Sequence, residues 1–213
     1  MGAIEIEARA TSAAPWTLRR VVTAGVIGNV LEWYDFAVYG FFAPILAAQF
    51  FPSTDPRVSL LAAFAAFAVG FLMRPVGAAV FGHIGDRYGR ARALLLSVAM
   101  MAVPTVLMGL LPTYETIGIA ASVLMVWLRM CQGIAVGGEF TASIVFLAEN
   151  APPRRRGFFA SFSMFGATTG TMLGSAVGAL LTTTLDPEAL ASWGWRVAFV
   201  SGIAVAVVGL VIR

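Results

Sequence analysis

Long apolar stretches alternate with short polar breaks along almost the whole chain. A helix that crosses the hydrocarbon core of a bilayer needs about 20 largely apolar residues, and such stretches recur from residue 21 onward. We predict spanning helices at 21–50, 58–83, 91–111, 117–149, 158–184 and 193–212. Prolines, glycines and aspartates lie between them, as expected of turns. Ten-residue alternating segments typical of membrane β-strands are absent. The predicted fold class is therefore an all-α membrane protein with six transmembrane helices.

The composition supports this prediction. The chain has 213 residues, of which 59% are hydrophobic and 12% charged, and its mean hydropathy is +0.86. Soluble domains carry about 25% charged residues, so most of this surface must face lipid. The net charge of +3 comes from short arginine clusters between apolar stretches, which does not favour nucleic-acid binding. A single cysteine excludes an intrachain disulfide, and no metal-ligand set is recognisable, so we expect no metal.

The arginines are distributed unevenly between the two sides of the predicted bundle. One side carries Arg9, Arg19, Arg20, Arg87, Arg90, Arg92, Arg154, Arg155, Arg156 and Arg213. The short loops of the other side contain Arg57 and little else that is basic. The positive-inside rule then predicts a multi-pass protein of the bacterial inner membrane with both termini in the cytoplasm. Residues 1–20 are polar and do not resemble a signal peptide, so we expect a cytoplasmic tail followed by a transmembrane domain at 21–213.

Three of the predicted helices carry polar and charged residues, which lie on one face of each helix. They are Asn29, Glu32, Asp35 and Tyr39 in the first helix, Arg74 in the second, and Arg129, Gln132 and Glu139 in the fourth. The spacings of three and four residues in the first helix place its four side chains on a common face. A charge inside a membrane costs roughly 2.5–3.5 kcal/mol on insertion scales, so each one suggests a function.

Two interpretations fit these interior charges. They could be structural ion pairs that hold the bundle together. Alternatively, two acids on one helix and arginines on two others could form a site for protons and a charged solute. A carboxylate taken out of water is harder to keep ionised, and a nearby arginine favours the ionised form. A change in their separation would then drive protonation and release, as coupling to a proton gradient requires.

The fifth predicted helix contains a regular stripe of glycines. Gly166, Gly170, Gly174 and Gly178 repeat at every fourth residue. Such a stripe lets another helix approach closely. It predicts a tight helix–helix interface, which is either static or a sliding surface.

The segment between the second and third predicted helices carries a recognisable motif. It reads Gly82-His83-Ile84-Gly85-Asp86-Arg87-Tyr88-Gly89-Arg90 and resembles the signature loop of the major facilitator superfamily. The resemblance implies that Gly82, Gly85, Asp86, Arg87, Gly89 and Arg90 form part of a cytoplasmic gate. Glu149 and Arg156 match the positions of the charges that this loop clasps in the superfamily.

Further motifs narrow the resemblance. Arg129-Met130-Cys131-Gln132-Gly133 is similar to a fourth-helix motif whose arginine is associated with proton coupling. The stretches 28–36, 74–77, 137–139 and 193–196 look like the metabolite:proton symporter family within that superfamily. The fifth helix lacks the glycine-proline pair typical of drug:proton antiporters, which argues against efflux. The resemblance implies an N-terminal domain of two inverted three-helix repeats.

The resemblance implies proton-coupled symport of a small organic acid or a zwitterion such as betaine or proline, with the proton gradient as energy source and no cofactor. The residues expected to couple protons are Glu32, Asp35, Arg129 and Glu139. Those expected to contact the substrate are Asn29, Tyr34, Tyr39, Arg74 and Gln132. Arg74 would anchor a substrate carboxylate.

Superfamily members place the substrate between two six-helix halves, and this chain supplies the N-terminal one. We expect it either to work with a second six-helix half or another copy of itself, or to be a truncated half-domain that does not transport. A membrane enzyme is not favoured, because no nucleophile–base constellation is recognisable. A passive channel is not favoured either, because the charges are not repeated as rings.

Overall fold

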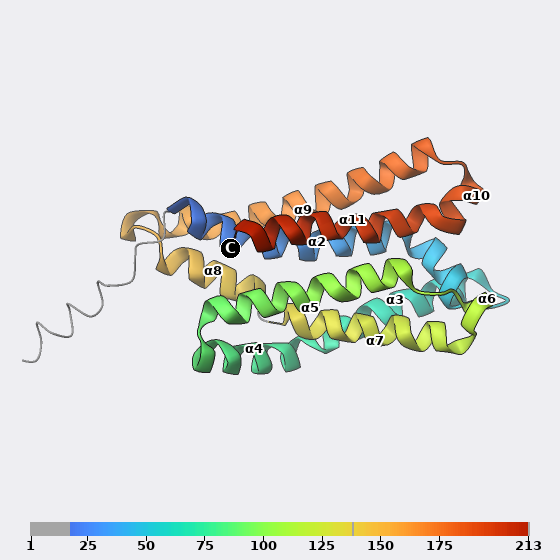
Figure 1. The fold of residues 1–213 in the computed structure, drawn as a ribbon, viewed down its shortest axis with the longest axis horizontal. Coiled ribbons are helices and arrows are strands. Elements are labelled where there is room, and N and C mark those ends of the chain that lie inside the picture. Colours follow the sequence, from blue (N-terminus) through green and yellow to red (C-terminus); the bar gives the residue numbers. More distant parts are fainter. Residues whose placement is uncertain (1–17, 138, 213) are drawn as a thin grey trace, which may run out of the picture.

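The computed structural model describes residues 18–137 and 139–212, and all regular structure in this part of the chain is helical. Figure 1 shows long helices packed side by side in an elongated bundle. They are α2 (Leu18–Phe50), α3 (Pro56–Leu72), α4 (Arg74–Tyr88), α5 (Arg90–Leu110), α6 (Tyr114–Ile117), α7 (Ile119–Val136), α8 (Glu139–Glu149), α9 (Arg156–Thr184), α10 (Pro187–Ala189) and α11 (Trp195–Ile212). Short 3₁₀ and π turns lie at Pro153–Arg155 and Leu190–Gly194. Most of the predicted N-terminal tail lies outside the described residues.

The predicted spans correspond to α2, α3–α4, α5, α7–α8, α9 and α11. The second is interrupted at Met73, just before Pro75, and the fourth at Gly137. Proline lacks the N–H that a continuous helix needs, and glycine weakens a helix interior. In the described residues, Gly25–Phe50, Pro56–Tyr88, Ile119–Glu149 and Pro153–Thr184 are long and apolar enough to cross a membrane, and Leu96–Leu110 is a shorter apolar helix.

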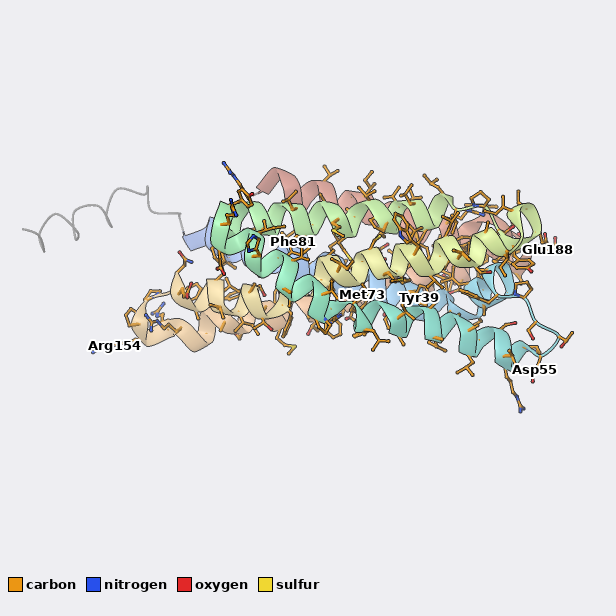
Figure 2. The ribbon with its side chains drawn as sticks, turned by 90° about the horizontal axis from the view of Figure 1, so that it is seen from below. Tyr39, Asp55, Met73, Phe81, Arg154 and Glu188 are labelled. Atoms are coloured by element: carbon orange, nitrogen blue, oxygen red, sulfur yellow. The ribbon has the colours of Figure 1, made fainter. Side chains whose placement is uncertain are left out.

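The arginine-rich breaks gather at one end of the bundle. The start of α2 and the end of α11 lie toward the same end as the α4–α5 connection (Figure 1). In Figure 2, Arg154 lies at that end, whereas Asp55 and Glu188 lie at the opposite one. This arrangement agrees with the charge asymmetry read from the sequence. Which side of a membrane each end faces stays a prediction.

The glycine stripe of α9 packs directly against α2. A Cβ atom on Gly166 would lie 2.8 Å from the carbonyl oxygen of Val26, and one on Gly170 would collide with the carbonyl oxygen of Val30. Only glycine permits backbones to approach this closely. The predicted tight interface is therefore confirmed, while a sliding motion along it stays a prediction.

Arg196 ties α11 to the last turn of α5. Its Nη1 atom donates to the carbonyl oxygens of Gly109, at 2.9 Å, and Leu111, at 2.8 Å, and its guanidinium lies 4.5 Å from the centre of the Trp195 ring. The last carbonyls of a helix lack partners within the helix. The arginine therefore caps α5 and joins it to α11.

Replacing Arg196 with methionine should lower the apparent free energy of unfolding by about 1–3 kcal/mol, since two hydrogen bonds to backbone carbonyls are lost. Thermal unfolding of the purified protein in detergent measures this. Arg57→Met, at an exposed position in α3, is the matched control and should change little. Equal melting temperatures for the two variants would contradict the capping role.

Candidate functional site

Asp35 lies at the centre of a buried polar cluster. Its side chain is fully buried and accepts hydrogen bonds from three donors on two other helices. Thr105 Oγ1 of α5 lies 3.0 Å from Oδ1, Gln132 Nε2 of α7 lies 2.9 Å from Oδ1, and Arg129 Nη1 of α7 lies 2.6 Å from Oδ2. Asp35 and Arg129 form a buried ion pair. Both oxygens of the buried carboxylate therefore have hydrogen-bond partners.

The Arg129 guanidinium is also held by aromatic rings. It lies 3.8 Å from the ring centre of Tyr39 and 5.4 Å from that of Phe67, where the π faces attract a cation. The Tyr39 hydroxyl donates to the carbonyl oxygen of Ala63 at 2.7 Å, which fixes the ring. Figure 2 places Tyr39 and Met73 about midway along the bundle. The cluster therefore lies deep in the bundle.

A second ion pair lies nearby. Arg74 Nη2 of α4 donates to Glu32 Oε1 of α2 at 2.9 Å. Glu32 is buried, whereas the Arg74 side chain is 30% exposed. The Arg74 guanidinium lies 4.1 Å from the ring centre of Phe71 and 5.3 Å from that of Phe36. Glu32 precedes Asp35 by about one helical turn, so both acids use the same face of α2.

A narrow cleft connects the two ion pairs. Its walls come from α2, α3, α4 and α7, and both Arg74 and Arg129 line it, together with Gln132 and the rings of Phe36 and Phe71. Its volume for water-sized molecules is about 10 Å³, which corresponds to about one water molecule. The cleft leads from the partly exposed Arg74 to the buried Arg129.

Close contact between backbones sets the distance across this cleft. A Cβ atom on Gly133 of α7 would collide with the carbonyl oxygen of Gly70 in α3, and one on Gly137 would collide with that of Arg74. Because no side chain separates the helices there, α3 and α4 lie directly on α7. This contact brings Arg74 and Arg129 to the same cleft.

Other residues expected at the site lie elsewhere. The Tyr34 hydroxyl donates to the carbonyl oxygen of Ala198 in α11 at 2.7 Å and lies 2.7 Å from Ser201 Oγ, so Tyr34 packs α2 against α11. Asn29 Nδ2 donates to Ser143 Oγ of α8 at 2.8 Å. Neither residue lines the cleft. The side chain of Glu139 lies outside the described part of the structure.

Three of the expected gate residues line a larger cavity. It has a volume of about 480 Å³, and Gly82, Gly85 and Asp86 of α4 line it opposite residues of α8 such as Thr141. Gly89 ends α4 with a φ of 95°, which favours glycine. Arg87, Glu149 and Arg156 are exposed at the helix ends, and the side chain of Arg90 is outside the described part. A gating role stays a prediction.

Sequence reasoning missed Thr105, the third donor to Asp35. A threonine in an apolar helix usually bonds a carbonyl of its own helix, and Thr105 Oγ1 does lie 2.9 Å from the Met101 carbonyl oxygen. It also accepts from Gln132 Nε2 at 2.8 Å. Its position directly after Pro104 in a span that contains few other hydroxyls is the only signal that could have singled it out.

Thr105→Val should lower the apparent free energy of unfolding by about 1–3 kcal/mol, because the buried Gln132 and Asp35 lose a partner while the side-chain volume is kept. Thr105→Ser retains the hydroxyl and should lose less. Thermal unfolding of both variants in detergent tests this difference. A valine variant as stable as the serine variant would show that the hydroxyl is not needed.

Comparisons with known proteins agree with this architecture. The chain matches the sugar (and other) transporter family over residues 21–213. It is 44% identical over 196 residues to the glycine betaine/proline/ectoine/pipecolic acid transporter OusA of Dickeya dadantii, covering 92% of this chain and 39% of that protein. It is 41% identical over 196 residues to the shikimate transporter of Escherichia coli, covering 92% and 45%. The chain thus spans about two fifths of the length of these relatives.

The fold also matches a solved transporter. The structure aligns with the partially occluded inward-open conformation of the xylose transporter XylE from E. coli with a TM-score of 0.81 and 22% identity, covering 92% of this chain and 49% of that one. This likeness confirms the predicted all-helical fold of the major facilitator superfamily. The chain therefore belongs to the sugar (and other) transporter family, a family of membrane transporters and not of enzymes.

Proposed function

We propose that this chain is the N-terminal six-helix half of a proton-coupled symporter for a small organic acid or zwitterion. Residues 1–20 form its cytoplasmic tail, both termini face the cytoplasm, and the membrane is the bacterial inner membrane. The observation that carries the proposal is the buried pair of Asp35 and Arg129, which lie 2.6 Å apart between two helices. An ionisable pair inside a membrane bundle is energetically costly, and such residues therefore mark functional sites by default.

The two ion pairs suggest how proton and solute are coupled. While Asp35 is ionised, it binds Arg129 and holds α2 to α7. Protonation removes the charge that attracts the guanidinium, so the two helices can separate or rearrange. Glu32 can hold and release Arg74 in the same way. Arg74 is the partly exposed cation and therefore the better anchor for a solute, while Glu139 is a further candidate to bind a proton.

The relatives support the substrate class. Glycine betaine, proline, ectoine, pipecolic acid and shikimate, which their names mention, all carry a carboxylate. Arginine is suited to bind such a group because its donors form a planar fork. We therefore assign the chain a carboxylate-bearing substrate and expect no cofactor beyond the proton gradient.

Uptake by the purified protein in proteoliposomes tests this function. With an inwardly directed proton gradient, at least one of four candidate solutes should accumulate: glycine betaine, L-proline, shikimate and α-ketoglutarate, the last of which is named in the α-ketoglutarate permease of E. coli, a relative with 42% identity. An ionophore that collapses the gradient should abolish the accumulation. Accumulation that persists after collapse would rule out proton coupling.

A half-domain that does not transport by itself is the second candidate. It is favoured by the share of the relatives' length that the chain covers, 39% of OusA and 45% of the shikimate transporter. It predicts no accumulation by this chain alone, but accumulation after fusion to the C-terminal half of OusA. Gradient-driven uptake by the unfused chain would exclude it and would imply pairing with another copy.

A further inference from the structure

We propose that the narrow cleft between Arg74 and Arg129 binds the carboxylate of the transported solute, and that this binding takes up one proton. The inference rests on the proposed function, because it names the part of the solute that the two arginines recognise.

The first observation is an unused edge of the Arg129 guanidinium. Nη1 donates to Asp35, whereas Nε and Nη2 are buried and have no hydrogen-bond partner among the described residues. The Arg129 side chain is only 2% exposed. Nε and Nη2 lie on one side of the guanidinium and together match the two oxygens of a carboxylate. A buried donor pair without a partner is costly, so this edge is suited to a ligand.

The second observation is the surroundings of that edge. Arg129 lines the same cleft as Arg74 and Gln132, and Gln132 Oε1 is a further buried atom without a partner among the described residues. Gln132 Oε1 can accept an N–H or O–H of the solute, while the arginines bind its carboxylate. The cleft has room for about one water molecule, so a carboxylate enters when Arg74 moves away from Glu32. The 30% exposure of the Arg74 side chain leaves room for this movement.

The third observation is the balance of charge. Among the residues whose side chains the structure describes, the acids and bases that line the cleft or form its two ion pairs are Glu32, Asp35, Arg74 and Arg129. The Tyr39 ring contacts Arg129, and its hydroxyl donates to the carbonyl oxygen of Ala63. Two carboxylates and two guanidiniums sum to zero. A solute carboxylate that enters the cleft adds one negative charge there, and this charge is uncompensated within the cleft when any cationic group of the solute stays outside it, which is unfavourable away from water. One proton from the aqueous phase, bound to a carboxylate oxygen of Glu32 or Asp35, restores neutrality.

Calorimetric binding measurements test the stoichiometry. The purified protein is titrated with glycine betaine, L-proline, shikimate and α-ketoglutarate in phosphate and in Tris, whose ionisation heats differ. Choline and L-prolinamide serve as matches that lack the carboxylate. We expect at least one of these solutes to bind, with uptake of about one proton per carboxylate bound and a Kd that weakens about tenfold for each unit of rising pH. Where glycine betaine or L-proline binds, choline or L-prolinamide, which lacks its carboxylate, should bind at least about tenfold more weakly. No proton uptake, equal binding of the match, or binding of none of the four acids would overturn the inference, and the cleft would then hold only water.

Two variants test whether the solute carboxylate binds in this cleft. Arg129→Lys keeps the charge opposite Asp35 but removes the two-donor edge, and the double variant Arg74→Gln with Glu32→Gln keeps the cleft neutral while removing its outer cation. Each should weaken carboxylate binding at least about tenfold, while Arg57→Gln should leave it unchanged. Circular dichroism and thermal unfolding show whether each variant is folded. Unweakened binding in both folded variants, with gradient-driven uptake intact, would overturn the carboxylate site and leave the proposed function standing.

Discussion

Asp35→Asn is expected to reduce proton-driven accumulation of solute to the background of empty liposomes. Asparagine has nearly the same shape as aspartate and can still accept from Thr105 and Gln132, but it cannot bind and release a proton. Arg129 would then lack its negative partner in every state. The protein should be able to bind solute and yet be unable to use a pH gradient. Uptake with and without an imposed gradient measures the loss.

The control replaces a carboxylate that has no part in the site. Glu188→Gln makes the same chemical change at an exposed residue at the end of the bundle far from Arg154 (Figure 2). It should retain full gradient-driven accumulation. If Asp35→Asn also accumulated solute normally, Asp35 would not be the coupling acid.

Loss of coupling at the Asp35–Arg129 pair has to be distinguished from loss of folding. Removing one partner of a buried ion pair costs about 3–5 kcal/mol, because the other charge remains buried. Either single variant, Asp35→Asn or Arg129→Ala, can therefore lose uptake through unfolding alone. The double variant Asp35→Asn with Arg129→Gln carries no charge at this pair, so it should be folded and still bind no coupling proton there. Its uptake therefore separates loss of coupling from loss of folding.

The apolar pattern predicted the helices well. The first predicted span ends at Phe50, as α2 does, because the apolar stretch stops at Pro52. The interruption at Met73 was not predicted, although Pro75 is visible in the sequence. Proline can bend or interrupt a membrane helix without ending the span, since neighbouring helices satisfy the freed carbonyls. Hydropathy alone does not separate these outcomes.

The site was predicted only in part. The sequence indicated which residues face inward, but not which acid binds which arginine. That pairing depends on how far α7 is shifted along α2 and α3, and the contact of Gly133 with Gly70 determines this shift. Tyr34 illustrates a second limit. Because α2 is surrounded by other helices, polar residues on different faces of it are all buried, and spacing could not show that Tyr34 bonds α11.

Gly133→Ala is expected to destabilise the folded bundle strongly. The added Cβ atom would collide with the carbonyl oxygen, carbon and Cα of Gly70, so backbone must move. Overpacking a core costs about 1–3 kcal/mol where side chains can adjust, and we expect at least the upper end of that range here. Separating α7 from α3 would also widen the cleft and weaken the stacking of Arg129 on Phe67.

Thermal unfolding and size-exclusion chromatography in detergent measure this loss of folded protein. Gly40→Ala is the matched control, since Gly40 is an exposed glycine within α2 and a Cβ atom there meets nothing within 4 Å. Because alanine favours a helix over glycine by about 1 kcal/mol, the control should be as stable as the original protein or more so. A Gly133→Ala protein that melts at or above the temperature of the control would show that α3 and α7 are not in backbone contact, and the assignment of Arg74 and Arg129 to one cleft would fail with it.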